Sequence, residues 1–126
     1  MTTNIELSNI INKLNFKHKF LGVFMKDQLP PKQRGWLICN TEDSLSQGKH
    51  WVLCWSHEIE SVYFSSFGEP ILPECKKWLG SCITSDFQIQ GFDEIICGEL
   101  CILIAYLMDN GCRFEDVVLG LLNESV

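Results

Sequence analysis

The sequence predicts an α+β domain in which a small, mostly antiparallel sheet packs against helices. Three observations lead to this fold class. Apolar residues recur at helical spacing near both ends of the chain, short apolar runs bounded by turn residues occupy its middle, and a long apolar run spans residues 100–108. With 126 residues, 46% of them apolar, the chain is expected to be one domain, 1–126, with its own core.

The first and second helices are predicted from capping signals. Thr3 followed by Glu6 is typical of a capping box, and apolar residues at helical spacing follow, so a helix is expected over about 4–14. Pro73 suits a first helical turn and Gly80 suits a stop, which predicts a short helix over 73–79.

Two further helices are predicted from apolar patterning. The run 100–108 precedes Asn110-Gly111, and it is apolar enough to predict a helix buried on nearly all sides. In the last helix, apolar residues share one face: Phe114, Val117, Val118, Leu121 and Leu122.

The strands are predicted from short apolar runs. Residues 36–39 form one such run, and 50–55 is apolar on both faces, which is typical of a central strand. Residues 61–65 follow as a hairpin partner, and 87–89 is expected to be an edge strand. Residues 16–24 mix basic and aromatic side chains and are interpreted as a solvated loop.

Charge and cysteine content narrow the function classes. The net charge of −6 gives no global attraction to nucleic acid or an anionic membrane, and no apolar run approaches membrane-spanning length. Seven cysteines without a recognisable secretion signal indicate reduced thiols inside a cell. Cys97 and Cys101 lack a second ligand pair at zinc spacing, so no metal site is expected. No other cofactor is expected either.

Three residues far apart in the sequence suggest nucleophilic chemistry. Cys97 falls at the start of the long apolar helix, where backbone N–H groups and the helix dipole are expected to lower the pKa of a thiol. His50 opens the central strand, and Gln90 could donate a hydrogen bond to an oxyanion. Singly, each is more often structural or on the surface. Together they predict a small cysteine protease.

A family resemblance rests on four stretches in a fixed order. They are 20–24 with Leu29-Pro30, 48–51 containing His50-Trp51, 63–68, and 90–101 with six residues between Gln90 and Cys97. With these motifs the chain resembles the adenovirus-type (adenain-like) cysteine proteases, including those of virus-like DNA transposons. That group is related to the SUMO and ubiquitin-like-protein proteases. The resemblance implies a papain-like arrangement with the nucleophile at the N-terminus of a central buried helix.

The resemblance also implies a role for each site residue. Cys97 would be the nucleophile, and His50 the base that deprotonates it and then the acid that protonates the leaving amine. Gln90 and the backbone N–H of Cys97 would form the oxyanion hole. Trp51 would form a wall of the substrate channel.

Ser65 departs from the family pattern, because family members usually carry Asp or Glu there to orient the histidine. A serine offers only a hydroxyl, so the thiolate–imidazolium pair is expected to be less populated at neutral pH. Three interpretations remain open. Ser65 suffices in a slower enzyme, another carboxylate such as Glu69 or Asp93 substitutes, or the protein is a pseudoenzyme that only binds.

The sequence and the resemblance together predict a thiol endopeptidase that cuts near small residues such as glycine and matures viral or virus-like precursor proteins. The alternatives are a protease that removes ubiquitin-like modifiers and a non-catalytic module that binds protein tails. The expected partners are a precursor polypeptide and, by resemblance, an activating peptide. Without a basic face, weak or no DNA binding is expected. We expect a monomer without membrane attachment, inside the host cell (cytoplasm or nucleus) and in the virion.

Overall fold

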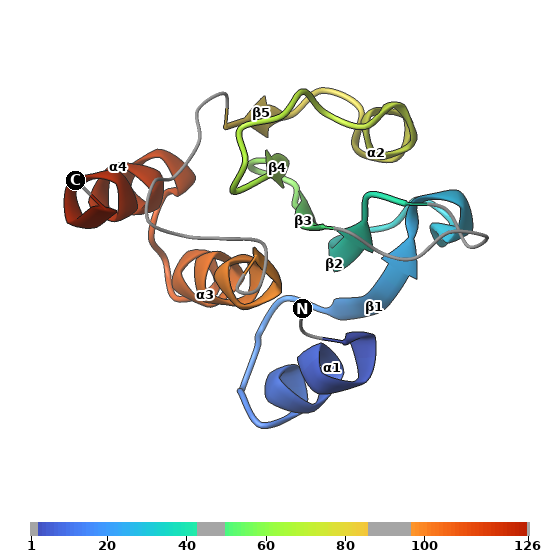
Figure 1. Ribbon diagram of the computed structural model, residues 1–126, viewed down its shortest axis with the longest axis horizontal. Helices are drawn as coiled ribbons and strands as arrows, with labels where there is room; N and C mark the ends of the chain where they lie inside the picture. The colour runs from blue at the N-terminus through green and yellow to red at the C-terminus, as the bar shows by residue number, and fades with distance from the viewer. Residues whose placement is uncertain (1–2, 43–49, 86–96, 126) are drawn as a thin grey trace.

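The computed structural model describes residues 3–42, 50–85 and 97–125, with side chains as far as Leu121. A five-stranded sheet has helices on both faces (Figure 1). The strands are β1 (Phe20–Met25), β2 (Gly35–Asn40), β3 (Trp51–Ser56), β4 (Val62–Phe64) and β5 (Ile83–Thr84). The helices are α1 (Asn4–Asn12), the 3₁₀ helix η1 (Lys26–Gln28), α2 (Pro73–Leu79), α3 (Cys97–Asp109) and α4 (Phe114–Ser125).

The sheet has its strands in sequence order, β1-β2-β3-β4-β5, with β3 in the centre as predicted. The pairs β2–β3 and β3–β4 are antiparallel, whereas the outer pairs β1–β2 and β4–β5 are parallel. The α+β class is therefore confirmed, but the sheet is mixed rather than mostly antiparallel. The difference lies in the two edge strands, neither of which was predicted.

Alternating side chains of the sheet divide the interior into two cores. Every residue of β2 and β3 is buried, which explains why residues 50–55 are apolar on both faces. Trp36 and Ile38 of β2 face the core beneath α1, α3 and α4, whereas Leu37 and Cys39 face the core beneath α2. Figure 1 shows α2 on one side of the sheet and α1 and α3 on the other.

The capping signals place the first two helices. Thr3 accepts the backbone N–H of Glu6 at 3.2 Å, and the Glu6 carboxylate accepts the N–H of Thr3 at 3.4 Å, so the predicted capping box is present. The helix ends at Asn12, two residues before the predicted end. The bounds of α2 match the prediction, and Gly80 follows it with φ of +73°, a value that favours glycine.

Two sequence predictions need correction, and a third lies outside the described residues. Residues 20–25 form the edge strand β1 rather than a loop, because their backbone pairs with β2 while their side chains stay only half-buried. The edge strand on the other side is β5, whereas the strand predicted at 87–89 lies outside the described residues. Helix α3 is not buried on nearly all sides, since Leu103 is 42% exposed and Tyr106 is 37% exposed.

The last helix has the predicted apolar face. Phe114, Val117 and Val118 are buried in the core beneath α3 and α4, and Leu121 packs against it. The side chain of Leu122 lies outside the described part. Among the described helices, none combines the length and apolar character needed to cross a membrane.

Candidate functional site

Cys97 is the first residue of α3, and its side chain is fully buried. The backbone N–H of Trp51, the residue after His50, donates a hydrogen bond to Cys97 Sγ at 3.3 Å. The N-terminus of α3 and the start of β3 are therefore in direct contact, which brings together two motifs 46 positions apart in the sequence. This contact is the centre of the candidate site.

The pKa of the Cys97 thiol is raised, not lowered as the sequence predicted. Burial is the largest cause, and the carboxylate of Glu99 acts in the same direction. The backbone N–H groups of Trp51, Gly98 and Cys97 act in the opposite direction but do not outweigh burial. At neutral pH the resting side chain is therefore a thiol.

His50 lies directly before β3 and is 3% exposed. Its Nε2 is 3.0 Å from the hydroxyl oxygen of Ser65, and the ring stacks on Phe67 with centroids 3.9 Å apart and planes 6° apart. Nδ1 is buried and has no hydrogen-bond partner among the described residues. Burial lowers the pKa of His50 to about 4, so the imidazole is neutral at pH 7.

Ser65 follows β4, is fully buried and is fixed by its neighbours. The Ser65 hydroxyl oxygen accepts the backbone N–H of Phe67 at 3.3 Å. The Ser85 hydroxyl accepts the backbone N–H of Ser65 and donates to its carbonyl, both at 3.4 Å. The Ser65 oxygen therefore occupies a defined position beside His50 without carrying a charge.

The hydroxyl of Ser65 is compatible with either tautomer of His50. If Nε2–H donates to Ser65, Nδ1 has a lone pair and can accept a proton; if Ser65 donates, Nδ1 holds the proton. A carboxylate only accepts, so an acid at this position would select the tautomer in which Nδ1 is a base. Serine leaves this choice open.

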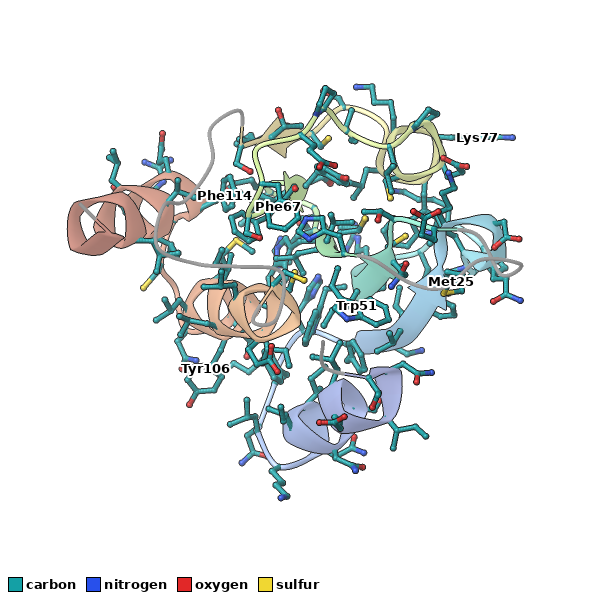
Figure 2. The ribbon with its side chains drawn as sticks, viewed as in Figure 1. Met25, Trp51, Phe67, Lys77, Tyr106 and Phe114 are labelled. Atoms are coloured by element: carbon teal, nitrogen blue, oxygen red, sulfur yellow. The ribbon has the colours of Figure 1, made fainter. Side chains whose placement is uncertain are left out.

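Trp51 begins β3 and is 5% exposed, within the core between the sheet and the helices. Figure 2 shows it between the sheet and helices α1 and α3. Its carbonyl accepts a hydrogen bond from Cys101 Sγ at 3.6 Å, one turn along α3 from Cys97. The backbone of Trp51 thus contacts α3 through two cysteines, and its role as a channel wall stays a prediction.

Gly98 allows α3 to approach the sheet this closely. A Cβ atom at Gly98 would lie 2.7 Å from Leu7 Cδ2 and 3.0 Å from Trp51 Cδ1, both below normal contact distance. Gly98 is part of the Cys97-Gly98 motif of the resemblance, but no packing role was predicted for it from the sequence.

We expect Gly98→Ala to destabilise the fold by about 1–2 kcal/mol, because overpacking outweighs the helix propensity of alanine. The matched control is Gly120→Ala in α4, where an added Cβ meets no atom within 4 Å. That control should stabilise by roughly 0.5–1 kcal/mol. Urea unfolding of both variants measures the difference. Equal stability of the two variants would contradict the close packing at Gly98.

Of the five site residues predicted from the sequence, the structure brings four together: His50, Trp51, Ser65 and Cys97. Gln90 lies outside the described residues, so its part in an oxyanion hole stays a prediction. Asp93 lies outside them as well. Glu69 is exposed, and no described carboxylate hydrogen-bonds His50, so the structure does not support Glu69 as the substitute acid.

Phe67 and Ser85 contact the site but were assigned no role from the sequence. Phe67 lies inside the motif 63–68, and a role could have been suspected from its position two residues after Ser65. Ser85 had no sequence signal, because the contact arises from the parallel pairing of β5 with β4.

No family model matches the chain. A search of curated proteins also finds no match.

Within the described residues, no three His, Cys, Asp or Glu side chains are placed to hold a metal ion, and no disulfide joins any of the seven cysteines.

Proposed function

We propose that the protein is a cysteine endopeptidase of the adenovirus type, in which Cys97 is the nucleophile and His50 the base. One observation carries this proposal. The thiol of Cys97 accepts the N–H of Trp51 next to His50, while Ser65 engages Nε2 of His50 and Nδ1 has no described hydrogen-bond partner. This arrangement supports Nδ1 as the atom that receives the thiol proton.

The proposed reaction starts from the neutral thiol and imidazole. Nδ1 of His50 takes the proton of Cys97 as Sγ bonds to the scissile carbonyl carbon, which becomes a tetrahedral oxyanion. The backbone N–H of Cys97 and Gln90 are proposed to stabilise this oxyanion. The imidazolium then protonates the leaving amine as the C–N bond breaks, which leaves a thioester on Cys97. Water, deprotonated by His50, attacks the thioester; the C–S bond breaks, the acid product leaves, and the imidazolium returns the proton to Sγ.

The substrate class rests on the sequence resemblance. We propose precursor polypeptides of a virus or virus-like element, cut near small residues such as glycine, inside the host cell and in the virion. Removal of ubiquitin-like modifiers is the second enzymatic candidate, because their tails end in Gly-Gly.

A non-catalytic binding module is favoured by a different observation. Cys97 is fully buried with a raised pKa, and no described carboxylate supports His50. Both features lower the population of the reactive thiolate–imidazolium pair.

We expect a short glycine-terminated peptide carrying a carbon electrophile to label Cys97, as read by mass spectrometry, and Cys97→Ser to abolish this labelling. Cys112→Ser is the matched control, because Cys112 is exposed and would account for nonspecific reaction. Labelling only by a full-length ubiquitin-like protein with the same electrophile would indicate a deconjugating enzyme. Tail binding without any labelling would contradict catalysis and favour the binding module.

A further inference from the structure

Phe67 contacts both members of the His50–Ser65 pair. Its ring lies parallel to the imidazole at a centroid distance of 3.9 Å, and its backbone N–H donates to the Ser65 hydroxyl oxygen at 3.3 Å. Figure 2 shows Phe67 beside β4, the strand that Ser65 follows. A single residue thus contacts both the imidazole ring and the hydroxyl oxygen that meets Nε2.

The contact has different consequences for the neutral and the charged imidazole. A neutral imidazole gains packing from the phenyl ring. An imidazolium is also attracted by the negative face of the ring, and this attraction is strongest where water is excluded. At 3.9 Å and with His50 3% exposed, the imidazole lies within cation–π distance of the ring face and is itself largely shielded from water.

Among the described residues, no charged group hydrogen-bonds His50 or shifts its pKa; burial alone shifts the pKa. The titratable groups that interact with Cys97 are Glu99 and Cys101, both on α3, and neither is a cause of the His50 pKa shift. The described hydrogen-bond partner of the imidazole is the neutral Ser65, and burial is the cause of the lowered His50 pKa. The face of Phe67 is therefore the described group best placed to stabilise a positive charge on His50.

We propose that Phe67 is a positioning residue for His50, whose ring face holds the imidazole plane and stabilises its charged form where a carboxylate is missing. This inference rests on the proposed function, because the imidazolium forms when His50 accepts the proton of Cys97. Phe67 itself exchanges no proton and touches no substrate atom in this scheme.

A double-mutant cycle tests the proposal with the full-length chain. The rate of Cys97 alkylation by chloroacetamide at pH 7 is measured for wild type, Phe67→Leu, His50→Ala and the double variant. Leucine keeps apolar bulk but removes the aromatic face. We expect Phe67→Leu to slow alkylation about threefold to tenfold when His50 is present and to have no effect when His50 is absent.

The conservative variant Phe67→Tyr keeps the aromatic face and should stay within about twofold of the wild-type rate. Equal slowing by Phe67→Leu with and without His50 would overturn the proposal, since it indicates general loosening of the site. An unchanged rate in Phe67→Leu would also overturn it. The alkylation readout needs no peptide substrate. If the peptide probe fails to label the wild-type protein but Phe67 and His50 remain coupled in the alkylation cycle, the proposed function alone is rejected.

Discussion

Ser65→Asp is expected to raise the pKa of His50 from about 4 by about 1–3 units and to speed alkylation of Cys97 at pH 7 at least tenfold. An aspartate would accept a hydrogen bond from Nε2–H, where the serine hydroxyl now lies 3.0 Å away. It would select the tautomer in which Nδ1 is the base and stabilise the imidazolium by charge. NMR titration of the imidazole and mass-spectrometric alkylation measure both effects.

Ser65→Asn is the matched control for Ser65→Asp, because its side chain has the same shape but no charge. We expect it to leave the pKa of His50 within about half a unit of the wild-type value. A folded Ser65→Asp protein with an unchanged His50 pKa would show that position 65 does not control the charge of the histidine.

As the pH falls from 7 to 4, protonation linked to His50 should lower the free energy of unfolding by up to about 3 kcal/mol. The sign follows from a folded pKa of about 4, below the unfolded value of about 6.5. Below the unfolded pKa the unfolded chain binds a proton that the folded protein excludes. The contribution is therefore present above about pH 6.5 and fully lost near pH 4.

Urea unfolding of wild type and His50→Asn at pH 7 and pH 4.5 isolates this contribution. Carboxylates titrate in both proteins, so their effect cancels in the comparison. The pKa of His18 is also lowered by burial, so His18 adds its own pH-dependent contribution to stability. His18→Asn is the second control, because it removes that contribution and leaves the one from His50. The same pH dependence in wild type and His50→Asn would show that His50 is not held neutral in the fold.

Local chemistry in the sequence was enough to predict several elements. The capping box at Thr3 and Glu6 and the Pro73 and Gly80 signals each act over a few residues, so their structural consequence depends little on the rest of the chain. The central strand was recognisable because burial on both faces requires a continuous apolar run.

The edge strands could not be predicted in the same way. β1 is half-buried and interrupted by a bulge beside Gly22, and basic residues precede it, so its composition is that of a surface segment. β5 contains only Ile83 and Thr84, both exposed, and forms because the backbone meets β4 in space. Pairing with a distant strand, rather than local propensity, determines both.

Four of the candidate site residues lie together in the fold, but their electrostatics could not be predicted from the sequence. The helix N-terminus at Cys97 was correctly placed, and its effect on the pKa has the expected direction. Full burial of the thiol reverses the net result, and burial depends on how α3 packs against Trp51 and Leu7. Such packing distances cannot be read from the spacing of motifs.

The most direct test of the Cys97–His50 pair is the pH dependence of Cys97 alkylation in wild type and His50→Ala. If His50 is the base, the wild-type rate should be nearly level from about pH 5 to pH 8, because the imidazole loses its proton near pH 4. Without His50, the rate should fall about tenfold per unit of pH below the thiol pKa. Identical profiles in the two proteins would contradict the pair and the proposed catalytic function with it.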